Sequence, residues 1–376
     1  MRKVAIWLVS VVGVGLLVAP AVFNMWVRAP RGAEMISDFT PYMTHARATQ
    51  YEQDYLPAIA VGFGGVPQAV SDASARYGDG VHPWSYSRAA SFLQSQPSLS
   101  ALSYVQRNFP TMAAPISNMV GVMVRDVGDF KGVAGLPPFW LFPLFFVLPG
   151  LILLVVGVML LRRERASQPA GRVPQWIALI IGAFLVVAPF APMPPGWVLM
   201  WLVTPGGAHM IDDFAGPANG MPGSAAIMSD ATANQFNSYL SYLNAGHREI
   251  VPAVQAVAAQ FGQSISAAEA QSFIAGDPKL AKVNDIVNRF PTMYASFHGM
   301  LTVMAKDVAD YEAVRALPRF TLFPWFFIIP GLIVAVAAAL ILGSDSKAGG
   351  QREYGRVNEL LGTATTGRQT AARERG

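Results

Sequence analysis

The stretch Phe139–Leu161, FWLFPLFFVLPGLILLVVGVMLL, decides the fold of this chain, and it returns at Phe320–Leu342 as FTLFPWFFIIPGLIVAVAAALIL. Neither copy contains Asp, Glu, Lys, Arg or His. Each is longer than the roughly 20 residues that a helix needs to cross a hydrocarbon core about 30 Å thick. Both copies carry L-F-P-x-F-F-x-x-P-G near their start. The sequence therefore predicts a membrane protein made of two related halves.

The composition of the whole chain favours the same class. Of its 376 residues, 53% are hydrophobic and only 13% are charged, against roughly 25% charged residues in ordinary soluble domains. The net charge of +4 comes from short basic segments beside the apolar stretches, so we expect no nucleic-acid partner. The chain has no cysteine, which excludes disulfides, thiolate metal sites and cysteine nucleophiles. The bias toward Ala, Val, Gly and Arg is typical of proteins from GC-rich bacteria.

Two more apolar stretches, 4–27 and 176–203, complete a set of four predicted spans. Ala19-Pro20-Ala21 in the first stretch resembles a signal-peptide cleavage site. The internal stretch argues against cleavage because it repeats four residues of the first: Trp7, Ala19, Pro20 and Trp26 correspond to Trp176, Ala188, Pro189 and Trp201. We expect the first stretch to be retained as an anchor, and the third span to be broken near its far end by prolines.

The spans divide the chain into predicted segments. These are the N-terminus with span one at 1–27, a helical domain at 28–138, span two at 139–161, a basic connector at 162–175, span three at 176–203, a second helical domain at 204–319, span four at 320–342 and a disordered tail at 343–376. The N-terminus, the connector and the tail are rich in Lys and Arg, whereas both domains are neutral or acidic. The positive-inside rule then predicts cytoplasmic termini and two domains outside the cytoplasmic (inner) membrane.

The internal repeat extends beyond the spans. Residues 85–150 align with 266–331 without a gap, and 28 of the 66 aligned pairs are identical. A second block, 32–39, aligns with 207–214. Because each half contains two spans, both halves enter the membrane with the same orientation. We therefore expect a pseudo-twofold axis along the membrane normal.

Within each domain the clearest predicted helix follows the repeated Phe-Pro-Thr-Met block. Its apolar residues are spaced by three or four, which indicates one buried stripe. Pro110 and Pro291 suit a first helical turn, and Pro115 predicts a later start or a kink in the first copy. Weaker patterns predict helices at 54–63 and 235–261, so both domains should be mainly α-helical. Six methionines of the two stripes are read as core side chains rather than a Cu(I) site: Met112, Met119, Met123, Met293, Met300 and Met304.

Paired aspartates are the main candidate chemical feature. Asp126 and Asp129 recur as Asp307 and Asp310, each pair after a basic residue. A catalytic pair needs an environment that shifts one pKa. These residues lie off the apolar stripe, so we predict a solvated or salt-bridged helix face, where neutral substitutions change stability by at most about 1 kcal/mol.

A second candidate is a metal cluster formed by His209, Asp212 and Asp213. The aligned positions of the first half hold Glu34, Ser37 and Asp38, so only the Asp38/Asp213 position is shared. An Asp beside a helix start is more often a cap, and we predict no metal and no cofactor. The positions that both halves share, which are our candidate site residues, are Asp38, Asp213, Asp126, Asp129, Asp307, Asp310, Pro149, Gly150, Pro330 and Gly331.

The Pro-Gly pairs at 149–150 and 330–331 have two interpretations. They are either broken transport helices or kinks where two spans approach closely, which we favour. We expect spans two and four to meet there, because glycine permits close backbone contact. The spans lack ionisable residues, which argues against an ion-coupled carrier working alone.

No motif for nucleotide hydrolysis, α/β-hydrolase chemistry or zincin chemistry is present. Three function hypotheses remain. The first is a non-enzymatic accessory or scaffold subunit of a cell-envelope assembly, with membrane lipids and other envelope membrane proteins as partners. The second is a carrier for an apolar, lipid-like ligand, which a large apolar cavity would favour. The third is a membrane enzyme that uses the paired aspartates, which carboxylates converging in a pocket would favour.

Overall fold

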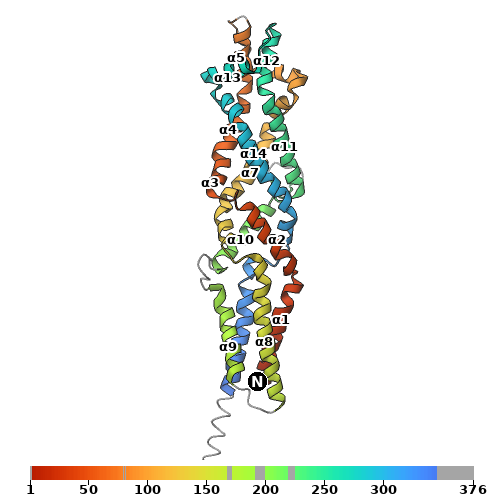
Figure 1. Ribbon diagram of the computed structural model, residues 1–376, viewed down its shortest axis with the longest axis vertical. Helices are drawn as coiled ribbons and strands as arrows, with labels where there is room; N and C mark the ends of the chain where they lie inside the picture. Colours follow the sequence, from red (N-terminus) through yellow and green to blue (C-terminus); the bar gives the residue numbers. More distant parts are fainter. Residues whose placement is uncertain are drawn as a thin grey trace, which may run out of the picture. The chain divides into compact units, whose positions relative to one another are not determined.

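The computed structural model describes residues 2–78, 80, 82–166, 172–190, 200–218 and 225–344. These residues fold almost entirely into helices, so the predicted helical class is confirmed (Figure 1). The α-helices are α1 (Arg2–Val22), α2 (Met25–Phe39), α3 (His45–Thr49), α4 (Leu56–Gly64), α5 (Val66–Tyr77), α6 (Tyr86–Ser95), α7 (Ser100–Ala134), α8 (Phe142–Arg165), α9 (Arg172–Val187), α10 (Met200–Ala215), α11 (Asp230–Arg248), α12 (Ile250–Gln260), α13 (Ala267–Gly276) and α14 (Ala281–Arg315), followed by a last apolar helix within Phe320–Ser344. The only β-bridge in these residues is isolated, between Pro217 and Ala226. Residues 167–171 of the predicted connector and 345–376 of the predicted tail lie outside the described residues.

Four helical segments are long and apolar enough to cross a membrane, and they coincide with the four predicted spans. They are Arg2–Val22, Phe139–Arg165, Arg172–Phe190 and Phe320–Ser344. The first helix ends before the predicted residue 27, because Asn24 adopts a positive φ of 51° that interrupts the helical backbone. The third ends at a 3₁₀ turn that contains Pro189, and its predicted continuation at 191–199 lies outside the described residues.

The helices divide between two compact units. The span unit consists of Met1–Pro30, Gly135–Pro205 and Leu317–Gly376, and the helical unit consists of Arg31–Ala134 and Gly206–Ala316. The sequence predicts two domains, at 28–138 and 204–319. The two segments form one compact unit, because each long helix packs on helices of both segments.

In the span unit, glycines bring helices of the same half together. A Cβ added at Gly150 would lie 3.0 Å from the backbone oxygen of Gly13 in α1, and one at Gly331 would lie 2.8 Å from the backbone oxygen of Gly182 in α9. The prediction that Gly150 and Gly331 join spans two and four is therefore wrong. Each of these glycines packs against a glycine in the preceding span of its own half, because a close helix contact requires a small residue on both helices.

Spans two and four do meet, through phenylalanines of the repeated L-F-P-x-F-F pattern. The ring centroids of Phe142 and Phe323 are 5.6 Å apart, and those of Phe146 and Phe327 are 4.9 Å apart. Aromatic rings at these separations interact favourably beyond their buried area. The pattern is therefore a packing device between the two halves.

In the helical unit, the two segments are intertwined. α4 of the first segment packs on α14 of the second, and α11 of the second packs on α7 of the first. The Glu249 carboxylate, in the α11–α12 junction, accepts a hydrogen bond of 2.7 Å from the backbone N–H of Leu102 in the first turn of α7. Figure 1 shows these helices lying side by side. Neither segment completes its own core.

α7 and α14 are the long helices of this unit, with 35 residues each. The six methionines of the predicted stripes are all buried, which confirms their interpretation as core residues. Both helices start ten residues before their Phe-Pro pair, so Pro110, Pro115 and Pro291 lie inside helices rather than in a first turn. The helices tolerate these prolines because burial of the stripe outweighs the lost backbone hydrogen bonds. The other predicted helices appear as a π-helix, Gln50–Tyr55, that leads into α4, and as α11 and α12, which are separated at Glu249.

Candidate functional site

Two of the predicted aspartates are completely buried. The side chains of Asp126 in α7 and Asp307 in α14 have 0% exposure, and no oxygen of either carboxylate has a hydrogen-bond partner. Asp129 and Asp310, one helical turn later, keep 37% and 17% side-chain exposure. Neither Asp126 nor Asp307 is solvated as predicted, because α10 and α2 supply residues that cover this side of the long helices. Asp126 does keep the predicted ion pair, with Arg125 at 3.6 Å.

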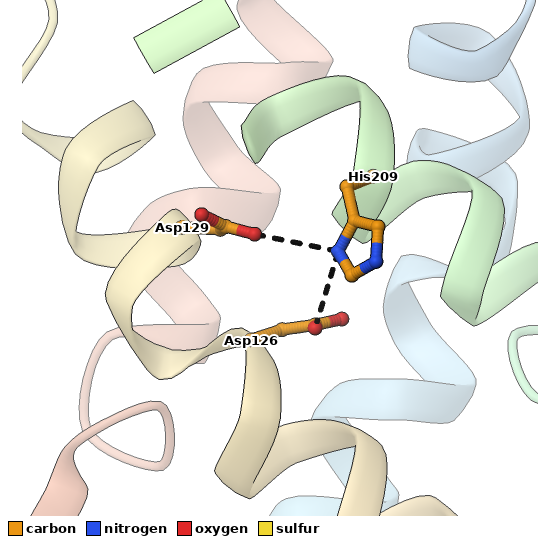
Figure 2. A group of neighbouring side chains, drawn as sticks. All are labelled: Asp126, Asp129 and His209. Atoms are coloured by element: carbon orange, nitrogen blue, oxygen red, sulfur yellow. Dashed lines mark ion pairs between the residues drawn. The ribbon is translucent and has the colours of Figure 1, made fainter. Parts of the chain in front are cut away.

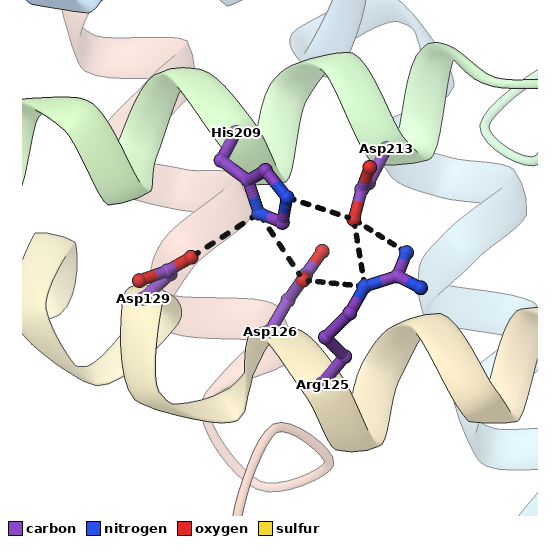
Figure 3. Close-up of polar contacts among 5 residues, drawn as sticks. All are labelled: Arg125, Asp126, Asp129, His209 and Asp213. Atoms are coloured by element: carbon purple, nitrogen blue, oxygen red, sulfur yellow. Dashed lines mark hydrogen bonds and ion pairs between the residues drawn. The ribbon is translucent and has the colours of Figure 1, made fainter.

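The first cluster lies between α7 and α10. Figure 2 shows the imidazole of His209 facing Asp126 and Asp129, with its Nδ1 atom 3.7 Å from Oδ1 of Asp126 and 3.4 Å from Oδ2 of Asp129. The other ring nitrogen, Nε2, lies 3.7 Å from Oδ2 of Asp213 (Figure 3). Arg125 donates a hydrogen bond of 3.0 Å from its Nε atom to the same oxygen of Asp213. The side chains of Arg125, Asp126, Asp129, His209 and Asp213 thus form one connected set of polar contacts (Figure 3).

The electrostatics of this cluster set Asp126 apart. Burial, first, and the Asp213 carboxylate, second, raise the pKa of Asp126 to about 6. The positive charge of Arg125 acts in the opposite direction. The hydrogen bond to Asp213 raises the pKa of Arg125, so this guanidinium stays charged. Strongly perturbed carboxyl groups of this kind are typical of functional sites.

The second cluster occupies the aligned position between α14 and α2. The ammonium group of Lys306 donates to Glu34 at 2.7 Å and to Asp38 at 2.6 Å. Nε of Arg31 lies 3.8 Å from Oδ1 of Asp310. Burial, followed by the carboxylate of Asp38, raises the pKa of Asp307 to about 6. Each half therefore contains one buried aspartate next to an ion pair between the two segments. The pair is Arg125–Asp213 in the first cluster and Lys306–Asp38 in the second.

The clusters differ at two aligned positions. Glu34 stands opposite Lys306 where His209 stands in the first cluster, and Arg31 approaches Asp310 where Gly206 adjoins Asp129. A Cβ added to Gly206 would collide with the Asp129 carboxylate. The first cluster therefore lacks the second cation of its counterpart, and it has a nitrogen donor in the place of the Glu34 carboxylate.

The metal cluster suggested by the sequence is not assembled as proposed. Asp212 is exposed, while His209 turns toward Asp126 and Asp129 on another helix. The three donor atoms of Asp126, Asp129 and His209 lie within 4.8 Å of one another. Sequence reasoning missed this set because it joins residues of α7 to one that lies 80 or more positions later in the chain. The signal available in the sequence for this site was the pair of aspartates that follows a basic residue in both halves.

The remaining shared positions are structural. Pro149 lies inside α8 with its neighbour Gly150 against α1, and Gly331 lies against α9. None of these is in the helical unit, which holds the charged clusters.

The hollows of the helical unit are of two kinds. A wholly apolar cavity of about 40 Å³ contains aligned residues of both segments, and a second apolar cavity has about 20 Å³. A larger, partly open hollow of about 350 Å³ has aromatic walls and a polar rim. Its residues include Phe63, Tyr86, Gln94, Gln106, Arg107 and Phe109.

The chain is thus a helical protein with four candidate membrane spans and a second helical unit that contains two buried acidic clusters. No protein-family model and no curated protein sequence matches it.

Proposed function

We propose that this protein is a non-enzymatic, multi-pass membrane protein that serves as an accessory or scaffold subunit of a bacterial cell-envelope assembly. The observation that carries this proposal is the intertwined helical unit, in which α7 and α14 each depend on helices of the other segment. Such a unit is one compact body connected to the spans at four points of the chain. That arrangement suits a fixed platform better than two independently moving domains.

The proposal includes two homologous halves around a pseudo-twofold axis. Three aligned pairs line the apolar cavity of about 40 Å³, namely Met35 and Met210, Phe39 and Phe214, and Phe130 and Tyr311. Aligned residues that meet at one point are expected close to such an axis. The aligned contacts Gly13–Gly150 and Gly182–Gly331 add support from the span unit.

The alternative functions receive less support. Pockets for small ligands usually enclose about 300–1,000 Å³, and the two wholly apolar cavities are far too small for a lipid chain. The convergence of carboxylates around His209 favours the enzyme hypothesis as the second candidate. However, neither Asp126 nor Asp307 lines any of the three hollows above, so a substrate has no evident access to them.

Purification of the tagged full chain from its native membranes in mild detergent tests the function. We expect a membrane protein to co-purify in stoichiometric amount. Arg107→Glu, in the lining of the large hollow, should reduce its recovery several-fold, because this hollow is the largest of the three described above and the one with space for a side chain of a partner. Lys282→Glu, at an exposed position of the second segment, is the matched charge-reversal control. Recovery of one bound lipid per chain and no protein partner would instead support the carrier.

Topology has a separate test, because the chain contains no natural cysteine. Three arginines, Arg162, Arg163 and Arg165, end α8, and the positive-inside rule places this end in the cytoplasm. A cysteine at exposed Ser98 should react with an impermeant maleimide in intact cells, and one at exposed Ala166 should react only after permeabilisation. The reverse pattern would put the helical unit in the cytoplasm.

A further inference from the structure

The set Asp126, Asp129 and His209 has the arrangement of an incomplete coordination shell. One nitrogen and two carboxylate groups face a common point from two helices (Figure 2). The Nδ1 atom of His209 lies 3.4 and 3.7 Å from the two carboxylates. With metal–ligand bonds of about 2.1 Å, two donors on one ion stand roughly 3.0–3.4 Å apart. The two nitrogen–oxygen separations therefore reach coordination distances after a contraction of a few tenths of an ångström, and all three donor atoms lie within 4.8 Å of one another.

The burial of Asp126 is an independent indication of a missing ligand. Its carboxylate has 0% exposure and no hydrogen-bond partner for either oxygen. The nearest cationic atom of Arg125 lies 3.6 Å away, beyond normal hydrogen-bond distance. A buried carboxylate without hydrogen bonds is costly unless an ion satisfies it.

The surroundings of His209 match those of a metal-binding histidine. Such residues usually direct their second ring nitrogen at a carboxylate, which fixes the orientation of the ring. Here Nε2 faces Asp213 at 3.7 Å, which is an ion-pair contact longer than a hydrogen bond, and Arg125 holds Asp213 by a hydrogen bond of 3.0 Å (Figure 3). Gly206 lets Asp129 approach from the other side, since a larger residue would displace its carboxylate.

We propose that Asp126, Asp129 and His209 bind a divalent transition-metal ion of the Zn²⁺ or Mn²⁺ type, with Asp213 orienting the imidazole. Three carboxylates and one guanidinium leave two negative charges around a neutral imidazole, which a divalent cation balances. The nitrogen donor favours transition metals over Ca²⁺ and Mg²⁺, which prefer oxygen ligands. The second cluster has no histidine, and Lys306 already occupies two of its carboxylates. Of the two clusters, only the first therefore binds such an ion.

Calorimetric titration of the chelator-treated full chain in detergent with Zn²⁺ and Mn²⁺ tests this site. Titration with Co²⁺ provides an absorption signature of nitrogen and oxygen ligation. We expect one ion per chain. His209→Gln and Asp126→Asn should each weaken binding by more than about 100-fold, and Asp213→Asn should weaken it by about 10-fold, as expected for a residue that orients a ligand.

The second cluster supplies the matched controls. Asp307→Asn and Glu34→Gln should leave the affinity within about twofold of the unmodified chain. His209 has 53% side-chain exposure, so its replacement preserves the packing, and circular dichroism verifies folding of every variant. The proposal is overturned if the unmodified chain shows no saturable binding below millimolar metal. Binding that His209→Gln and Asp126→Asn leave unchanged would overturn it equally.

Discussion

Replacement of Gly13 by leucine is expected to disrupt the pairing of α1 and α8 and to lower the free energy of unfolding by about 3 kcal/mol or more. A Cβ at this position would lie 2.7 Å from the backbone nitrogen of Leu154 and 3.0 Å from the backbone oxygen of Gly150. Because both obstacles are backbone atoms, no side-chain rotation relieves the overlap and the helices must separate. Thermal unfolding in detergent, followed by circular dichroism, measures the loss.

Gly15→Leu is the control for this prediction. Gly15 lies two residues away in the same helix, and a Cβ added there meets no atom within 4 Å. Gly15→Leu introduces the same side chain as Gly13→Leu, so the two variants share any effect of helix propensity or hydrophobicity on stability. Gly182→Leu should reproduce the loss, because its added Cβ would lie 2.6 Å from the backbone nitrogen of Ala335. Equal melting temperatures for Gly13→Leu and Gly15→Leu would contradict the observed packing.

Asp307→Asn is expected to stabilise the protein at neutral pH by up to roughly 3 kcal/mol. Burial, first, and then the nearby acidic groups raise the pKa of Asp307 from 3.8 to about 6. The groups that face it are Lys306 and Asp310 from α14, and Glu34 and Asp38 from α2. The native state therefore binds more protons than the unfolded state between these two pKa values. Stability falls as the pH rises from about 4 to about 6 and changes no further through this group above that range.

Asparagine cannot ionise, so the variant should lose this pH dependence. The gain in melting temperature should be full at pH 7.5, should shrink as the pH falls toward 4, and should be absent below the unfolded pKa of 3.8, where Asp307 is protonated in both states. Glu312→Gln is a control on the same helix, because Glu312 is exposed and its contact with Arg315 is worth at most about 1 kcal/mol. A variant less stable than the parent at pH 7.5 would show that the ionised carboxylate stabilises the fold. This result would reject the present account of Asp307.

The sequence by itself determined the four apolar spans and the two long stripe-bearing helices of this protein. Over twenty successive apolar residues in 139–161 define a span, because only a helix satisfies the backbone in hydrocarbon. Apolar residues spaced by three and four define the buried stripe of α7 and α14, including Met119 and Met300. These signals are local, since they depend on the hydropathy and period of one segment. The alignment of the two halves likewise required no coordinates.

Only the tertiary structure decided which surfaces meet. Asp126 lies off the apolar stripe and looks solvated along α7, yet His209 and Asp213 of α10 come over that face and bury it. Gly150 suggests a close contact but cannot specify the partner, which is Gly13 rather than Gly331. The physical reason is the same in both cases. The hydrophobicity or small size of a residue indicates that its surface can be covered. Which residue covers it depends on how helices from distant segments cross.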